Sequence, residues 1–160
     1  MQKKKTLAFF TAAAVTASIT TPAMAASFTD VTSPYKESVN YLVSNGIANG
    51  FSDTEFGISG KIKRVDMAVM LAKALKLNTA SAPKSGFTDV PDRGEGAVDA
   101  LKAAGLVNGK TTKSFGSDDL MTRGEMALIL ANAYELKGTA SLKFTDVAGR
   151  YTKAVEALVA

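Results

Sequence analysis

Aspartate and arginine recur at matching positions along this 160-residue chain. Asp30, Asp89 and Asp146 each stand in a Phe-Thr-Asp-Val tetrapeptide, and Arg64 and Arg123 follow the first two at the same interval. An arginine can hold a carboxylate with two parallel hydrogen bonds, and a carboxylate accepts hydrogen bonds from sugar hydroxyls. Repetition favours binding, because a catalytic carboxylate pair needs only one site. The structural alternative is that the aspartates cap turns or helices and the arginines pair with carboxylates inside one repeat.

The composition excludes most familiar classes of enzyme. The chain has no His and no Cys, which removes the commonest general base, the commonest neutral metal ligand, cysteine nucleophiles and disulfides. The acidic pairs Asp53-x-Glu55 and Asp118-Asp119 lack the pattern of a calcium loop. We therefore predict no enzymatic activity, no metal and no cofactor. Nucleic acid is not an expected partner, because the basic residues are not interleaved with aromatics and Trp is absent.

Much of the formal net charge of +4 lies at the extreme N-terminus, in Lys3, Lys4 and Lys5. An uncharged apolar run over residues 7–19 follows, and the segment closes with Ala23-Met24-Ala25. This layout is typical of a secretory signal peptide, and the run is shorter than the ~20 residues that span a bilayer. Cleavage after residue 25 would leave 16 basic and 15 acidic residues. We predict an exported protein that is not membrane-bound after cleavage; an uncleaved anchor is the alternative.

The chain repeats itself. Residues 28–77 and 87–136 are identical at 18 of 50 positions, and a third copy begins at Phe144. The predicted organisation is a signal peptide at 1–25, a first repeat at 26–86, a second at 87–143 and an incomplete third at 144–160. Because repeat proteins generally need about three units to bury a continuous core, we expect the chain to be a fragment and residues 26–160 to be marginally stable.

Each complete repeat predicts a helix, a glycine-rich loop and a second helix. In the first helix of the first repeat, Ser33 is the predicted N-cap and Gly46 the left-handed C-terminal cap. The second helix is predicted from Arg64 to Leu77, with a Met- and Leu-rich apolar face. The predicted apolar face of its counterpart in the second repeat consists of Met126, Ile129, Leu130, Ala133 and Tyr134. The phenylalanines of both repeats and of the third copy are expected in the core. They are Phe28, Phe56, Phe87, Phe115 and Phe144.

The second helix of the second repeat begins with a distinct signal. Thr122-Arg123-Gly124-Glu125 predicts a capping box, in which the Thr hydroxyl and the Glu carboxylate each bond the other residue's amide. At the equivalent position the first repeat has Lys63, which cannot accept a capping bond. The two second helices are therefore predicted to begin differently.

The order of these motifs resembles the S-layer homology (SLH) motif. The resembling succession is Phe-x-Asp-Val, a Val-x-x-Leu helix, Gly-Ile/Leu-x-Asn-Gly, Phe, and Thr-Arg-x-Glu-Met-Ala, and it covers residues 28–160. SLH motifs usually stand in three tandem copies on surface proteins of Gram-positive-type bacteria. The resemblance implies an all-α fold of helix-loop-helix repeats, pseudo-threefold, with three lobes around a central bundle.

The resemblance also implies a function. SLH domains anchor exported proteins non-covalently by binding secondary cell-wall polysaccharide on peptidoglycan, in many members pyruvylated, and other S-layer subunits are further partners. The implied location is the cell wall or S-layer. The implied glycan-binding residues are Asp30, Arg64, Asp89, Arg123 and Asp146, with Gly50 and Gly109 offering backbone contacts. The alternative is a helical-repeat module for protein interaction or for an S-layer lattice, without glycan binding.

Overall fold

The structure is a computed structural model that describes residues 28–160. Its helices are the 3-10 turn η1 (Ser33–Tyr35), α1 (Lys36–Ser44), α2 (Arg64–Ala74), α3 (Asp92–Ala103), α4 (Arg123–Ala133), the 3-10 turn η2 (Gly149–Tyr151) and α5 (Thr152–Val159). In this part of the chain β-structure is limited to one isolated bridge between Lys63 and Leu120. The predicted all-α class is confirmed. The predicted signal peptide, 1–25, lies outside the described residues.

The helix ends agree with the sequence in part. Gly46 has a φ of +65°, so the predicted left-handed cap of α1 is confirmed. The predicted Ser33 cap is wrong, because the chain enters η1 from Thr32, which makes no side-chain capping bond. The second helix was predicted to reach Leu77 but ends at Ala74. The amide of Leu77 turns back to the carbonyl of Ala72 at 3.0 Å, which returns the Leu77 side chain to the core.

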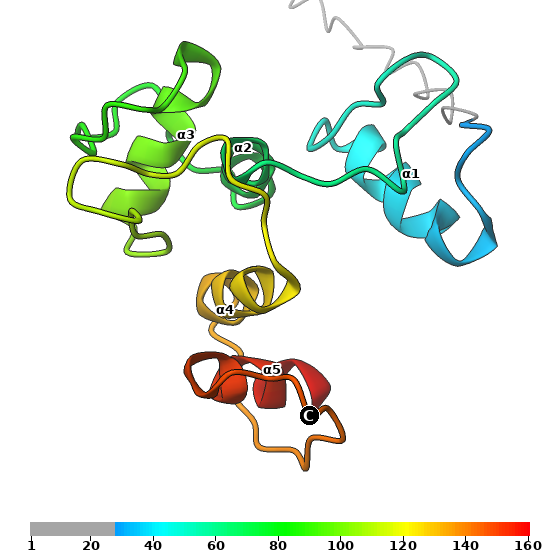
Figure 1. Cartoon of the computed structure of the whole chain (residues 1–160). Coiled ribbons are helices and arrows are strands. Elements are labelled where there is room, and N and C mark those ends of the chain that lie inside the picture. Colours follow the sequence, from blue (N-terminus) through cyan, green and yellow to red (C-terminus); the bar gives the residue numbers. More distant parts are fainter. Residues whose placement is uncertain (1–27) are drawn as a thin grey trace, which may run out of the picture.

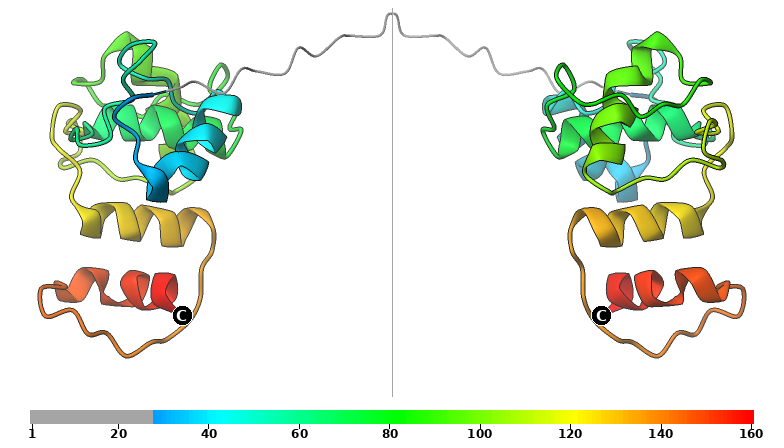
Figure 2. Two further views of the ribbon diagram at one scale, coloured as in Figure 1. Left: turned by 90° about the vertical axis from the view of Figure 1, so that its right-hand side faces the viewer. Right: turned by 90° about the vertical axis from the view of Figure 1, so that its left-hand side faces the viewer.

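Helices pair across repeats and not within them. The second helix of the first repeat, α2, packs against α3 of the second repeat, and α4 packs in the same way against α5 of the third copy. In Figure 1, α2 lies between α1 and α3. Both views of Figure 2 show α4 and α5 side by side beneath the rest of the described chain. In both cases, therefore, the second helix of a repeat packs against the first helix of the repeat that follows.

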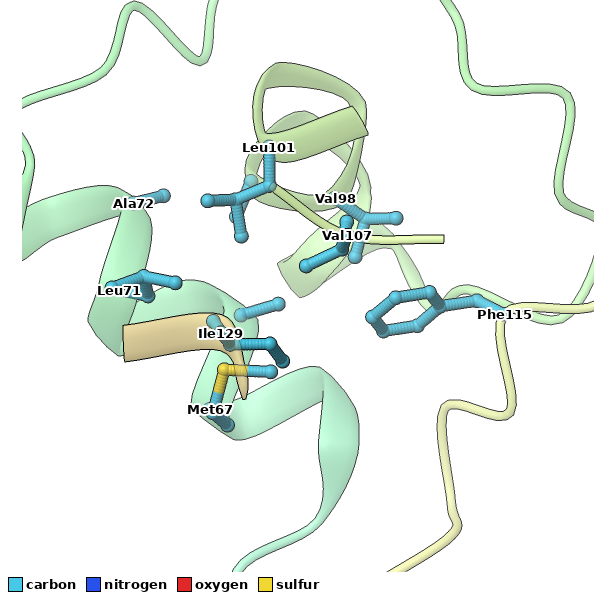
Figure 3. Close-up of a cluster of buried hydrophobic side chains, with 10 residues drawn as sticks. Met67, Leu71, Ala72, Val98, Leu101, Val107, Phe115 and Ile129 are labelled. Carbon is cyan, nitrogen blue, oxygen red and sulfur yellow. The ribbon is translucent and has the colours of Figure 1, made fainter. Parts of the chain in front are cut away.

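The main core lies at the junction of the two complete repeats (Figure 3). Met67 and Leu71 come from α2, Leu101 from α3, Phe115 from the loop after α3, and Ile129 from α4. Phe115 is fully buried, so the prediction of a core role is confirmed for it. Because this core draws on three helices and a loop, it fixes the position of that loop relative to α2 and α4.

Two side chains predicted to be apolar contacts lie instead at the surface. Phe144 is 56% exposed and Tyr134, at the C-cap of α4, is 54% exposed. For these two residues the prediction of a core position is wrong. Tyr134 follows the last turn of α4, so the helical periodicity that assigned it to the apolar face no longer applies.

Candidate functional site: a groove between repeats

The aspartate of the second repeat closes the loop that follows α3. The Asp89 carboxylate accepts hydrogen bonds from the amides of Phe115, Gly116 and Ser117 at 2.7, 2.7 and 3.3 Å, and from the Ser114 hydroxyl at 2.8 Å. Burial opposes ionisation of this carboxyl, but the hydrogen bonds outweigh it and lower its pKa from 3.8 to about 2. Asp89 is therefore a charged hydrogen-bond acceptor that holds the loop of its own repeat in place.

Asp30 does the same in the first repeat. Its carboxylate accepts from the amides of Phe56, Gly57 and Ile58 at 2.9, 2.7 and 3.0 Å. The hydrogen bond from Phe56 is the main cause that lowers the pKa of Asp30. Asp30 and Asp89 thus behave as in the structural alternative considered above, with oxygens occupied by loop amides.

Arg64 joins the first repeat to the second. Its side chain is buried, with Nε donating to the carbonyl of Phe115 at 3.0 Å and one terminal nitrogen donating to the carbonyl of Asn108 at 2.7 Å. The guanidinium also lies over the Phe115 ring, 4.7 Å from its centre. The other terminal nitrogen lies 3.8 Å from Glu125 of α4. One arginine therefore connects α2, the second-repeat loop and α4.

The backbone reinforces this junction at the N-terminus of α2. Lys63 provides no cap, as predicted. The first amides of α2, from Arg64 and Val65, instead donate to the carbonyls of Asp119 and Ser117 at 2.8 and 3.1 Å. The orphan donors of this helix are therefore satisfied by the next repeat.

The capping box predicted for α4 is present. Glu125 donates its amide to the Thr122 hydroxyl at 3.2 Å and accepts from the Thr122 amide at 3.1 Å. The ammonium of Lys110 lies 2.9 Å from Glu125. Burial opposes ionisation of Glu125, but the Lys110 and Thr122 hydrogen bonds lower its pKa from 4.5 to about 2. Glu125 is therefore anionic at physiological pH and compensates neighbouring cations.

These elements enclose a groove of about 390 Å³, termed the inter-repeat groove. Its lining comes from α2, the loop after α3, α4 and the turn η2. The lining residues are Arg64, Gly105, Leu106, Val107, Asn108, Gly109, Lys110, Glu125, Leu128, Ile129, Asn132, Arg150 and Tyr151. The lining combines three cationic residues and one carboxylate with a tyrosine, two asparagines and glycine-rich backbone. Such a lining suits a polar, anionic ligand.

The structure gathers only two of the seven predicted site residues in this groove, namely Arg64 and Gly109. A Cβ on Gly109 would overlap the Phe87 ring and the carbonyl of Thr111, so glycine is required there by close packing. Gly50 is packed in the same way against Phe28, in the first repeat.

The remaining predicted residues lie apart from the groove. Arg123 and Asp146 are exposed, and within residues 28–160 neither side chain forms an ion pair or a hydrogen bond. In the same part of the chain, no group of three acidic residues is placed to hold a metal ion, and no helix is long and apolar enough to cross a membrane.

Four other groove residues were not predicted from the sequence, namely Lys110, Asn132, Arg150 and Tyr151. A signal was available for Arg150, because alignment of the third copy with the second places it opposite Arg93. No such signal existed for Asn132, whose place in the groove depends on how α4 packs.

The fold and the groove define a helical-repeat protein with a ligand-sized site where successive repeats meet. Residues 27–68 and 86–127 match the family model described as the S-layer homology domain. The chain belongs to the S-layer homology domain family, as its motifs predicted.

Curated relatives agree with this assignment. The chain is 32% identical over 157 residues to an S-layer protein of Bacillus licheniformis, covering 92% of this chain and 18% of that protein. It is 32% identical to S-layer protein EA1 of Bacillus anthracis, covering 84% and 16%. It is 31% identical to an uncharacterized cell wall amidase of Bacillus anthracis, covering 100% and 32%. The chain thus spans less than a third of the length of these relatives.

Family membership supports a role in attachment at the bacterial cell surface or wall. The relatives carry different names, an amidase among them, yet share this region. The shared region is therefore a structural anchoring module.

Proposed function

We propose that the chain anchors an exported surface protein by binding secondary cell-wall polysaccharide in the inter-repeat groove, with pyruvylated sugar as the acidic component. The observation that carries the proposal is the cationic lining of the groove, where Arg64, Lys110 and Arg150 outnumber Glu125. Guanidinium and ammonium groups bind carboxylates, while amides such as that of Asn132 bind sugar hydroxyls.

The predicted site residues take different parts in this proposal. Arg64 and Gly109 line the groove, while Asp89 and Asp30 hold the loops in shape. Arg123 and Asp146 remain candidate contacts for the polymer outside the groove, because both are exposed.

Sedimentation with purified peptidoglycan sacculi tests the proposal. The protein should sediment with native sacculi and lose most binding after hydrofluoric acid has removed the wall polymer. Equal sedimentation with stripped sacculi would overturn the proposal and favour a module that binds peptidoglycan or protein.

A matched pair of variants locates the site. Asn132 is exposed and lines the groove, so Asn132→Glu places a carboxylate where an anionic ligand would lie. Asn40→Glu makes the same charge change on α1, away from the groove. We expect only Asn132→Glu to weaken sedimentation; equal effects of the two variants would contradict the groove as the site.

A further inference from the structure

We propose that Arg150 selects an anionic sugar in the inter-repeat groove, through the carboxylate that the sugar carries. This inference rests on the proposed function and names the residue that gives the groove its preference for a charged ligand.

Two of the three cations in the groove are already compensated. Lys110 lies 2.9 Å from Glu125 and 3.8 Å from Asp119. Arg64 lies 3.8 Å from Glu125 and directs its Nε and a terminal nitrogen to backbone carbonyls. Because these donors already have partners inside the protein, a ligand could bind them only by displacing those partners.

Arg150 differs from both. It is exposed, it lines the groove, and within residues 28–160 its side chain forms no ion pair or hydrogen bond. Its guanidinium lies over the ring of Tyr151, 4.6 Å from the ring centre. A cation–π contact uses the charge of the guanidinium and leaves its N–H donors free for a ligand. Arg150 is thus held beside Tyr151 and is uncompensated.

The corresponding arginine of the second repeat is in the opposite condition. Arg93 occupies the same position relative to its Phe-Thr-Asp-Val segment, but it donates to Asp66 at 2.8 Å. A carboxylate of the protein thus already fills the place that a ligand carboxylate would take. In the inter-repeat groove the residue equivalent to Asp66 is Glu125, which is held by Lys110 and Thr122. Because Glu125 pairs with Lys110 and Thr122, it does not pair with Arg150 in the way that Asp66 pairs with Arg93.

Carboxylated sugars match this geometry. A guanidinium binds a carboxylate with two parallel hydrogen bonds, while Asn132 and the backbone around Gly109 can bind sugar hydroxyls. The carboxylate could belong to a pyruvyl ketal or to a uronic acid, since the two groups present the same chemistry to an arginine. The probes below separate these sources.

The test measures binding of three probes to the whole chain by calorimetry or by NMR titration. The probes are methyl N-acetylmannosaminide carrying a 4,6-pyruvyl ketal, the same glycoside without the ketal, and methyl glucuronide. We expect the Arg150→Ala variant to bind whichever carboxylated probe the unaltered protein binds roughly ten- to a hundredfold more weakly, and to bind the neutral glycoside unchanged. Arg150→Gln, which keeps a side chain over Tyr151, should show the same loss. Arg93→Ala is the matched control and should behave as the unaltered protein.

The results separate this inference from the proposed function. If the unaltered protein sediments with native sacculi and Arg150→Ala keeps its preference for carboxylated probes, the role of Arg150 is overturned while the anchoring function stands. Equal losses in Arg150→Ala and Arg93→Ala, or an equal loss for neutral and charged probes, would also overturn it. If the unaltered protein binds neither sacculi nor any probe, both proposals fail.

Discussion

The Nε of Arg64 lies 3.0 Å from the carbonyl oxygen of Phe115, a residue 51 positions further along the chain. This hydrogen bond joins the second helix of one repeat to the loop of the next. A second bond from the same guanidinium reaches Asn108, at the edge of the inter-repeat groove. The repeats are therefore not independent units, because the groove wall of the second depends on a side chain of the first.

Removing this link should destabilise the protein. Arg64→Ala leaves two carbonyls near the core without their charged donor, which should lower the free energy of unfolding by about 3 kcal/mol. Urea denaturation followed by circular dichroism measures the change. Arg123→Ala is the control, since Arg123 is the repeat counterpart of Arg64 but is exposed, and a change within about 0.5 kcal/mol is expected. Similar losses in both variants would contradict a special role for Arg64.

Acid should unfold the loops through their carboxylates. The folded pKa values of Asp89 and Glu125 are about 2, against ordinary values of 3.8 and 4.5. A depressed folded pKa adds stability above the ordinary pKa, and this stability is lost as pH falls through the folded pKa. Stability should therefore fall between about pH 4.5 and pH 2.

Asp89→Asn should remove part of this pH dependence and lower stability at pH 7 by about 2 kcal/mol. Asp146→Asn is the matched control in the third copy, where the carboxylate accepts no side-chain or loop hydrogen bond within residues 28–160. Thermal melts of both variants across this pH range measure the effect. An unchanged acid transition in Asp89→Asn would contradict the proposal that the Asp89 carboxylate holds the second-repeat loop in place.

Close packing at Gly109 should make the second-repeat loop intolerant of a methyl group. Gly109→Ala would drive a Cβ into the Phe87 ring and the carbonyl of Thr111, and should cost about 1–3 kcal/mol. Nothing lies within 4 Å of a Cβ on Gly149, so Gly149→Ala should be nearly neutral. Denaturant midpoints of the two variants give the comparison, and a neutral Gly109→Ala would show that the loop can shift.

The end of α2 offers a route to stabilisation. Lys76 has a φ of +52°, a left-handed conformation that costs a residue with a side chain about 1 kcal/mol or more. Lys76→Gly should therefore raise the unfolding free energy by about 0.5 kcal/mol, after the entropic cost of glycine. Lys73→Gly, within the same helix, should instead lower it by about 1 kcal/mol. Thermal melting of both variants measures the contrast; a lower melting temperature for Lys76→Gly would contradict the account.

Much of the local structure was predictable from short patterns. The capping box at Thr122 and the left-handed glycine at Gly46 follow from neighbouring residues, and both were confirmed. The end of α2 was not predictable in this way, because Leu77 turns back to reach a core built partly by the next repeat. The Asp30 and Asp89 carboxylates could be recognised as recurring acids, but their loop partners lie 25–28 residues further along the chain.

The repeats, the helical class, the family and the lack of His and Cys could all be read from the sequence alone. These properties depend on residue type and local order. Which charges remain available to a ligand depends on tertiary contacts. Arg64, Arg93 and Arg150 are chemically identical side chains, yet their surroundings differ. Arg64 is buried and donates to backbone carbonyls, Arg93 is paired with a carboxylate, and Arg150 lines the groove without a carboxylate partner in the described residues. The difference arises because the second helix of each complete repeat packs against the following repeat, so the partners of a charge come from distant parts of the chain.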